Sequence, residues 1–447
     1  MPSLSKAGGT FVVGFSLAKS LEPDADGMIL INAPSVRDLQ IIFELNSLPQ
    51  GKATCILNHQ TAIPAGGTYG FMRLADTNNG SSDMDIGIYV KQVTQSENTA
   101  DSVALTFDFV VGSKLSDMKL INFACTGTSI AAMKECITRA GMEPLVKYMD
   151  NGKNADLMTW RLINGNMNEH LNYILSHSYV PSDIVYWGLD ETTGKIVIST
   201  FNTEKSSKNK SFFFYSTDAM SSTSTAAYNP KNLAGTTVYR YNALERGDNT
   251  SVWRGKMFPN LVVDTTNNHG EKETGDCGGE CIDVIMSTAG ATPIPKSLKP
   301  PKGSAGVYSE PKMAMAFPQN GHKKFAVAET IRGRLLSEYG RILKVRIYNH
   351  LGPRVGSCVY VVVPNSKIRE GDLLPDRDFT ARYIVMNKVV NKVTQSSAGT
   401  LGTTRNNMTT EYETFIELAT NFPYKNPTKE FQWVTNAVNK LTGSMKK

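Results

Sequence analysis

The stretch Asn166-Met-Asn-Glu-His-Leu-Asn-Tyr-Ile-Leu-Ser176 predicts a helix near the middle of the chain. Asn166 is a candidate N-cap, and Glu169 three residues later gives a variant of the capping box. The apolar residues that follow fall on one face. The next stretch, Val185-Tyr-Trp-Gly-Leu-Asp-Glu-Thr-Thr-Gly-Lys-Ile-Val-Ile198, predicts two strands joined by a turn. A helix followed by such a hairpin indicates a small α/β module.

A second amphipathic helix is expected earlier in the same module. Ile130, Met133 and Ile137 are spaced so that they share one helical face, and Gly141 is well placed to end the helix.

Residues upstream of the module have the pattern of β structure. The stretch Val103-Ala-Leu-Thr-Phe-Asp-Phe-Val-Val111 alternates large and small side chains, which places the large ones on one face of a sheet. Residues 27–31 and 86–93 are also rich in β-branched and aromatic residues. Turn clusters at 64–67 and 78–81 separate these runs. Several short strands with such turns favour a barrel or a sandwich.

Residues 325–421 return to strand patterns. The run 359–363 predicts a strand that is covered on both faces, and residues 342–348 alternate. The stretch Glu411-Tyr-Glu-Thr-Phe-Ile-Glu-Leu418 alternates too, with its glutamates and Phe415 expected on the outward face. These patterns predict a second β unit.

The predicted fold is mainly β with an α+β module: two β-barrel-like domains, a small α/β domain and a long insertion or linker. The 447 residues are enough for about three domains. The expected parts are a first β-barrel-like domain at 1–118, the α/β module at 119–201, an insertion or inter-domain arm at 202–325, a second β-barrel-like domain at 326–422 and a C-terminal helix at 423–447.

The C-terminal helix is the predicted interface element. Phe431, Val434, Val438 and Leu441 are spaced three, four and three residues apart, which gives a heptad-like stripe, and Trp433 lies beside it. Because a short isolated helix is marginal in water, we expect it to pack on its own domain or on a neighbouring chain.

Composition narrows the class of protein. The net charge of +6 is mild for this length, so it permits acidic partners without requiring nucleic-acid binding. The apolar run 11–18 is too short to span a membrane, and no other stretch approaches the necessary length of about 18 residues. We expect a soluble chain, made in the host cytoplasm, with no membrane-spanning segment and no cleaved signal peptide.

One loop carries candidate metal ligands. Asp276-Cys277-Gly-Gly-Glu-Cys281 and the nearby His269 bring three soft ligands together, but a fourth is missing. Three interpretations of this loop are open: a metal site, a disulfide formed after release, or a reduced flexible loop. Six cysteines in so long a chain favour the reduced loop, and no cofactor is expected.

Other candidate catalytic residues have ordinary explanations. His170 and His177 are seven residues apart, whereas paired metal ligands on a helix are four apart, so both are expected on the helix surface. Asp190 and Glu191 are adjacent carboxylates, but they open the predicted hairpin turn, where solvated side chains are expected. No nucleophile elbow or phosphate-binding loop occurs in the sequence. A non-enzymatic function is therefore favoured.

The order of β unit, module and second β unit resembles the baseplate (tail) hub proteins of contractile-tailed bacteriophages, with which the hub portion of type VI secretion spike proteins is grouped. The residues that carry the resemblance are the helix 166–178, the strand pair 184–199 and the strand set 344–418, in which Gly352-Pro-Arg-Val-Gly356 leads into a valine-rich strand. The resemblance covers most of the chain but includes no short invariant motif, and residues 202–325 depart from the compact family pattern.

The resemblance implies a homotrimer in the tail baseplate of a virion. Two barrel-like domains per chain give six units around the axis, which match a sixfold tail tube on one side, while the threefold face receives a central spike on the other. The implied partners are further copies of the chain, the tail tube protein, the central spike protein, other baseplate proteins, and DNA that passes transiently through the channel without sequence-specific binding.

Two alternatives remain open at this point. A receptor- or glycan-binding tail-tip protein would use an exposed aromatic residue such as Trp253. A cell-wall hydrolase would use the carboxylates of Asp190 and Glu191.

Overall fold

The computed structural model describes the following residues: 11–18, 29–31, 35–58, 66–76, 84–98, 102–112, 120–148, 156–181, 183–206, 213–216, 236–238, 240–245, 322, 328, 332, 335, 336, 339, 341–348, 351–361, 381–396 and 408–421. Most of the insertion predicted at 202–325, and all of the helix predicted at 423–447, lie outside these residues.

The N-terminal strand group forms an antiparallel sheet in the order β3-β4-β7-β6-β5-β1-β2. Its strands are β1 (Phe11–Ala18), β2 (Ile29–Ile31), β3 (Val36–Glu44), β4 (Gln50–Asn58), β5 (Thr68–Asp76), β6 (Met84–Asn98) and β7 (Ser102–Val111). The predicted alternation in β7 is confirmed, because Leu105, Phe107 and Phe109 are buried. Phe15 of β1 meets Phe107 edge to face, with ring centroids 5.1 Å apart. The sheet therefore curls until β1 and β7 face each other across the core.

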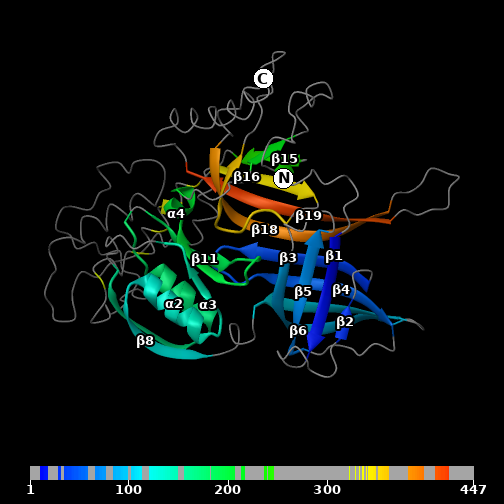
Figure 1. The fold of residues 1–447 in the computed structure, drawn as a ribbon, viewed down its shortest axis with the longest axis horizontal. Coiled ribbons are helices and arrows are strands. Elements are labelled where there is room, and N and C mark those ends of the chain that lie inside the picture. The colour runs from blue at the N-terminus through cyan, green and yellow to red at the C-terminus, as the bar shows by residue number, and fades with distance from the viewer. Residues whose placement is uncertain are drawn as a thin grey trace, which may run out of the picture.

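The module that follows has two helices between two small sheets (Figure 1). Its elements are β8 (Ile121–Gly127), α2 (Ser129–Arg139), β9 (Pro144–Val146), β10 (Met158–Gly165), α3 (Met167–Ser176), β11 (Val185–Leu189), β12 (Ile196–Thr200) and α4 (Phe201–Ser206). β8 and β10 form one antiparallel pair. β12 pairs antiparallel with β11 and parallel with β9 in the other sheet.

The helix signals in the sequence are confirmed. The Asn166 side chain accepts a hydrogen bond from the Glu169 backbone N–H, and the Glu169 carboxylate accepts one from the Asn166 N–H, each at 2.9 Å. Thr128 caps α2 by accepting from the Ala131 N–H at 3.4 Å. Gly141 follows α2 with φ of 80°, a left-handed conformation that suits glycine at a helix end.

The C-terminal strand group is built around β18. Its strands are β13 (Phe213–Ser216), β14 (Thr236–Val238), β15 (Arg240–Glu245), β16 (Arg341–Tyr348), β17 (Cys358–Val361), β18 (Ala381–Ser396) and β19 (Met408–Thr420). β18 pairs antiparallel with β17 and β19, and β16 pairs antiparallel with β15 and β19. β13 is parallel to both β14 and β17.

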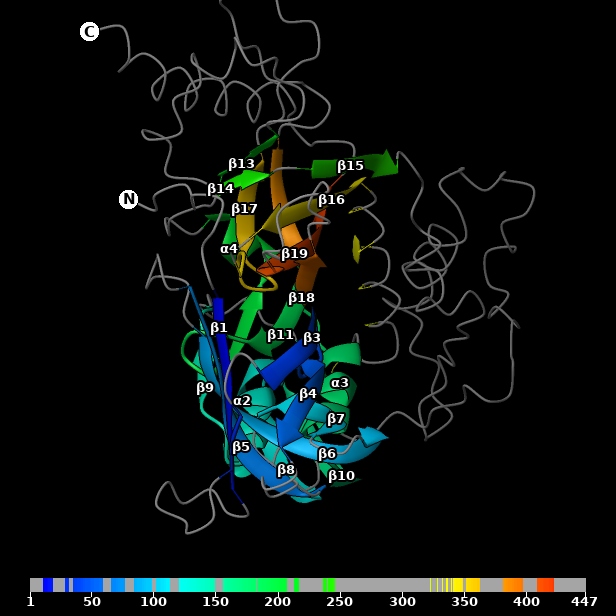
Figure 2. The ribbon, with the colours of Figure 1, turned by 90° about the vertical axis from the view of Figure 1, so that its right-hand side faces the viewer.

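The two strand groups meet in one sheet. β18 holds β19 along one edge, while its other edge pairs first with β17 over 381–384 and then with β3 over 387–391. This pairing creates a 14-stranded sheet that runs from β14 to β2, with the module beside the junction (Figures 1 and 2). The predicted mainly β character with few helices is confirmed. Within the described ranges, however, no ladder closes either group into a barrel.

Candidate functional site: the junction of the module and the sheet

The junction begins where β18 changes partners. Gly356 donates its N–H to the Val385 carbonyl at 2.8 Å, and Val385 donates to Ser357 at 3.1 Å. One residue further along, the Leu45 N–H reaches the Met386 carbonyl at 3.3 Å. The loop before β17 and the turn after β3 thus supply hydrogen bonds where β18 passes from one strand group to the other.

Asn46 connects this turn to the module. Its φ is 61°, a left-handed conformation that asparagine tolerates better than most residues. The Asn46 N–H donates to the Trp187 carbonyl at 3.0 Å, and its side-chain oxygen accepts from the Trp187 N–H at 3.1 Å. One asparagine therefore pairs with the backbone of β11 as a neighbouring strand would. Trp187 and the adjacent Tyr186 are fully buried.

A buried ion pair fixes the hairpin turn on the sheet. The Lys388 ammonium of β18 contacts the Glu191 carboxylate, and both side chains are almost completely buried. The same ammonium lies 4.5 Å from the centroid of the Phe43 ring. The prediction that Glu191 is solvated was wrong, because the sheet covers the turn that carries it. Asp190 does stay in the turn, where it accepts two hydrogen bonds from Thr192.

This burial weakens the hydrolase alternative. A glycosidase requires two carboxyl groups that face a common substrate cleft. Glu191 instead faces Lys388 inside the protein, so the pair formed with Asp190 is not available to a polysaccharide.

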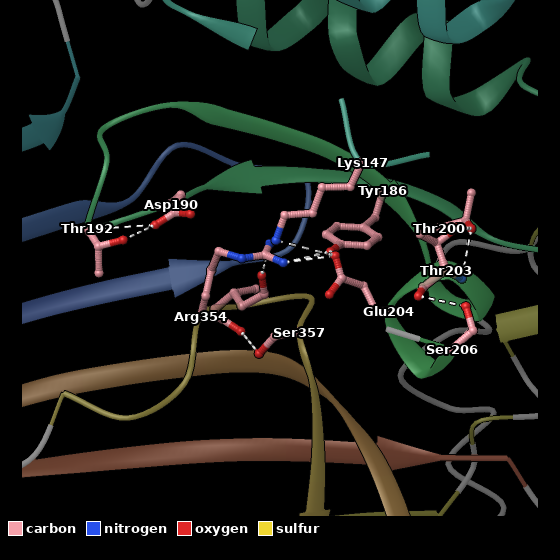
Figure 3. Close-up of polar contacts among 11 residues, drawn as sticks. Lys147, Tyr186, Asp190, Thr192, Thr200, Thr203, Glu204, Ser206, Arg354 and Ser357 are labelled. Carbon is pink, nitrogen blue, oxygen red and sulfur yellow. Dashed lines mark hydrogen bonds and ion pairs between the residues drawn. The ribbon is translucent and has the colours of Figure 1, made fainter. Parts of the chain in front are cut away.

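A second polar cluster joins α4, β11 and the loop before β17 (Figure 3). The Glu204 carboxylate accepts hydrogen bonds from the Tyr186 hydroxyl at 2.8 Å and from Arg354 Nη2 at 3.0 Å. Arg354 Nη2 also donates to the Tyr186 hydroxyl oxygen at 3.1 Å. Lys147, just after β9, brings its Nζ within 4.0 Å of Glu204. Three other segments of the chain therefore converge on the Glu204 carboxylate of α4.

Burial sets the protonation behaviour of this cluster. It raises the pKa of the Tyr186 phenol far above its ordinary value, so Tyr186 acts as a neutral donor. Burial and the nearby Arg354 guanidinium lower the pKa of Lys147, against the opposing effect of Glu204. Tyr186 therefore holds its proton and serves as a fixed donor to Glu204, not as a general base.

Gly356 makes this packing possible. Its φ is 85°, and a Cβ atom added there would lie 2.0 Å from Cε2 of Tyr186. The Tyr186 ring therefore lies directly against the backbone, where no side chain fits. The contact with the Tyr186 ring explains why glycine occupies position 356, at the end of the sequence Gly352-Pro-Arg-Val-Gly356.

A third attachment comes from the segment that precedes β16. His322 Nε2 lies 2.7 Å from the His177 carbonyl, and Arg332 donates to the Val185 carbonyl. Tyr339 is buried in a smaller apolar cluster beside α4. The junction is thus a set of interlocking contacts that holds the module on the sheet.

Several predicted site residues lie outside the described residues. These are the metal candidates Cys277, Cys281 and His269, the interface candidates Phe431, Trp433, Val434, Val438 and Leu441, and the aromatic Trp253. They remain predictions. In the part of the chain that the structure describes, no group of three or more His, Cys, Asp and Glu side chains comes together. No helix in that part is long and apolar enough to cross a membrane.

The prediction for His170 was wrong. His170 is buried, its Nε2 lies 2.7 Å from the Ile121 carbonyl, and its ring meets Phe123 edge to face at 6.4 Å. The helix periodicity contains the signal for this burial, because His170 shares a face with Met167 and Ile174. His177 is half-buried at the end of α3, with Nδ1 2.9 Å from the Tyr173 carbonyl.

Comparisons with known proteins gave matches among solved structures. No family model matches the sequence, and no curated protein matches it. Among solved structures, the tail protein from Neisseria meningitidis MC58 matches with 9% identity and a TM-score of 0.45, over 92% of this chain and 96% of that one. The 43 kDa tail protein of prophage MuSo2 from Shewanella oneidensis matches with 10% identity and a TM-score of 0.45, over 91% and 98%.

An E. coli component of the type VI secretion system also matches, with 10% identity and a TM-score of 0.42, over 87% of this chain and 75% of that one. It is described as structurally similar to the T4 bacteriophage tail proteins gp27 and gp5. Over most of its length, the chain resembles phage tail proteins.

Proposed function

We propose that this chain is a structural protein of a phage-type tail and forms a trimeric hub between a sixfold tail tube and a threefold central spike. The observation that carries the proposal is the joining of two strand groups, one from each end of the chain, through β3 and β18. Two β units fixed side by side in each chain supply six units when three copies surround one axis.

The junction supports a role that depends on shape and not on chemistry. The ion pair of Lys388 with Glu191 and the cluster around Glu204 use buried charges to hold the module against the sheet. Such contacts restrict relative movement of the parts, which a connector between two differently symmetric structures requires. The titratable groups of the junction are engaged with one another, and we infer a non-enzymatic function.

The proposed partners follow from the position of a hub. They are two further copies of the chain, the tail tube protein, the central spike protein and other baseplate proteins. The hub also forms part of the channel for genome ejection, so DNA passes through it transiently. The mild net charge of +6 is compatible with that passage, because a strongly positive lining would hold the phosphates.

Mass measurement tests the proposal directly. Mass photometry of the purified chain, alone and with its spike protein, should give a particle of three times the 49.0 kDa chain mass. Class averages from electron microscopy should then show a threefold ring around an axial opening. A stable monomer in both samples would contradict the hub assignment.

A further inference from the structure

The outward side of the β8–β10 sheet has an unusual surface for a solvent-facing sheet. Leu120, Leu157 and Ile163 occupy outward positions and are 64%, 65% and 71% exposed. The inward neighbours Trp160 and Leu162 are buried against the helices. Because Gly165 pairs with Ile121 and Met158 with Gly127, Leu120 and Ile163 lie near one end of this face and Leu157 near the other. Exposed apolar side chains at both ends of one small sheet indicate a surface that another molecule covers.

Arg161 lies on the same outward side, between the positions of Leu157 and Ile163. Among the described residues it forms no hydrogen bond or ion pair, and its neighbour across the pair is Ala124. We call Leu120, Leu157, Arg161 and Ile163 the module face. It is apolar with one unpaired cation, and that cation has five N–H donors to offer.

A second surface lies on β3, β18 and β19. The register places Ile42, Val389 and Phe415 in a row that crosses these three strands. Phe415 is 39% exposed, and the other two are half-buried. This apolar row is the centre of what we call the sheet face.

Acidic and amide side chains flank the row on both sides. One flanking row is Glu44, Asn387 and Glu417, and the other is Gln40, Asn391 and Glu413. The side-chain oxygens of Asn387 and Asn391 are buried and accept no hydrogen bond from any described residue. Glu44 is exposed and has no ion pair in the same part of the chain. The exposed Glu44 carboxylate can therefore accept from a cation that a second molecule presents.

The two faces cannot meet within one chain. Lys388, which follows Asn387 along β18, points to the other side of the sheet and contacts Glu191 of the module. The sheet face is therefore directed away from the module. β8 lies beyond α2 and α3 from β18 in both views (Figures 1 and 2), so the module face is at the remote end.

We propose that the module face of one copy packs on the sheet face of the next copy, an inference that rests on the proposed function. The apolar side chains of the module face cover the row of Ile42, Val389 and Phe415. Arg161 donates to the exposed carboxylate of Glu44. Because the faces differ, the contact is head-to-tail, and three such contacts close a ring. Complementary charge also fixes the register of the contact.

A charge exchange tests this contact. Arg161→Glu and Glu44→Arg should each weaken trimer assembly at least tenfold in mass photometry, and the two substitutions together should restore a large part of it. Phe415→Ser should weaken assembly in the same way. Lys134→Glu is the matched control, because Lys134 is an exposed cation on α2 outside the module face, and it should assemble like the unaltered chain.

Thermal melting of each variant separates loss of folding from loss of assembly, since all the substituted side chains except Phe415 are well exposed. If the unaltered chain is monomeric with and without spike protein, the hub assignment fails. If it is trimeric and Arg161→Glu leaves the trimer intact, the hub stands and the proposed contact is overturned. Failure of the paired exchange to restore assembly would also overturn it.

Discussion

At the scale of single residues, the junction depends on charges that the fold buries together. Lys388 and Glu191 are each almost fully buried and contact each other. Dehydration of both ions is offset only while they remain paired, so each residue depends on the other. The exposed pair of Lys195 with Glu143 has the same chemistry in the same hairpin region but remains in water. Comparing the stability lost when each pair is broken therefore measures the effect of burial on an ion pair of the same chemistry.

Glu191→Gln is expected to destabilise the protein by about 3–5 kcal/mol, because it leaves the Lys388 ammonium buried without a counter-ion. Glu143→Gln should cost about 1 kcal/mol or less, as is usual for exposed pairs. Urea unfolding followed by tryptophan fluorescence measures both. The double variant Glu191→Gln with Lys388→Met should recover most of the loss, and equal effects of the two single variants would contradict the role of burial.

Gly356→Ala is expected to destabilise the protein more than Gly194→Ala does. Both glycines have positive φ, so alanine costs about 1 kcal/mol at either position. At Gly356 the new methyl group also collides with Tyr186, which adds about 1–3 kcal/mol, whereas nothing lies within 4 Å at Gly194. Differential scanning calorimetry of the two variants gives the comparison. A larger loss of stability in Gly194→Ala than in Gly356→Ala would show that the Tyr186 ring moves aside for the new methyl group.

At the scale of elements, the segment around His322 and the end of α3 form a contact that depends on pH. Burial lowers the pKa of His322, while the bond to the His177 carbonyl and the charge of Asp156 act in the other direction. Burial also lowers the pKa of His177, while its bond to the Tyr173 carbonyl opposes the shift. Both rings are therefore held neutral in the folded protein over a range in which the unfolded chain takes up protons.

Stability is expected to fall as pH falls from the unfolded value of 6.5 towards the lower folded pKa values of His177 and His322. Above pH 6.5 the contribution of these residues is fully present. Urea midpoints between about pH 7.5 and about pH 5 measure the effect. His322→Gln should flatten this dependence, and a dependence unchanged in that variant would assign it to other groups.

The elements themselves differ in how far the sequence predicts them. The caps and apolar faces of α2 and α3 depend on neighbours along the chain, so local patterns were sufficient for both. The position of β11 depends on Asn46, and the burial of Glu191 depends on β18, which are remote in sequence. Turn chemistry predicts the hairpin correctly but carries no information on the surface that covers it.

At the scale of the whole molecule, β18 makes one sheet from two strand groups that the sequence predicts as separate barrel-like domains. The alternation of side chains predicts each strand and its inward face, but any edge strand with a suitable pattern is a candidate neighbour. The pairing of β3 with β18 is fixed by contacts such as Phe43 with Lys388, which appear only once the chain is folded. Division of the chain into domains therefore remains a prediction.

The C-terminal stripe gives a prediction at this scale. If residues 431–441 form an interface helix, Val438→Asp should weaken assembly or local packing by about 2–3 kcal/mol, as expected for an unpaired charge that becomes buried. Mass photometry across a dilution series measures the change. Thr442→Asp, beside the stripe, is the matched control, and normal assembly of Val438→Asp would remove the helix from the interface.

The pairing of β3 with β18 also has a consequence during synthesis on the ribosome. β3 leaves the exit tunnel early, but its partner strand is translated only near the end of the chain. Through most of translation, the β3 edge of the nascent N-terminal sheet therefore has no partner strand. Unpaired sheet edges of this kind bind other chains. Chaperone occupancy of the growing polypeptide should accordingly persist until residues 381–396 emerge.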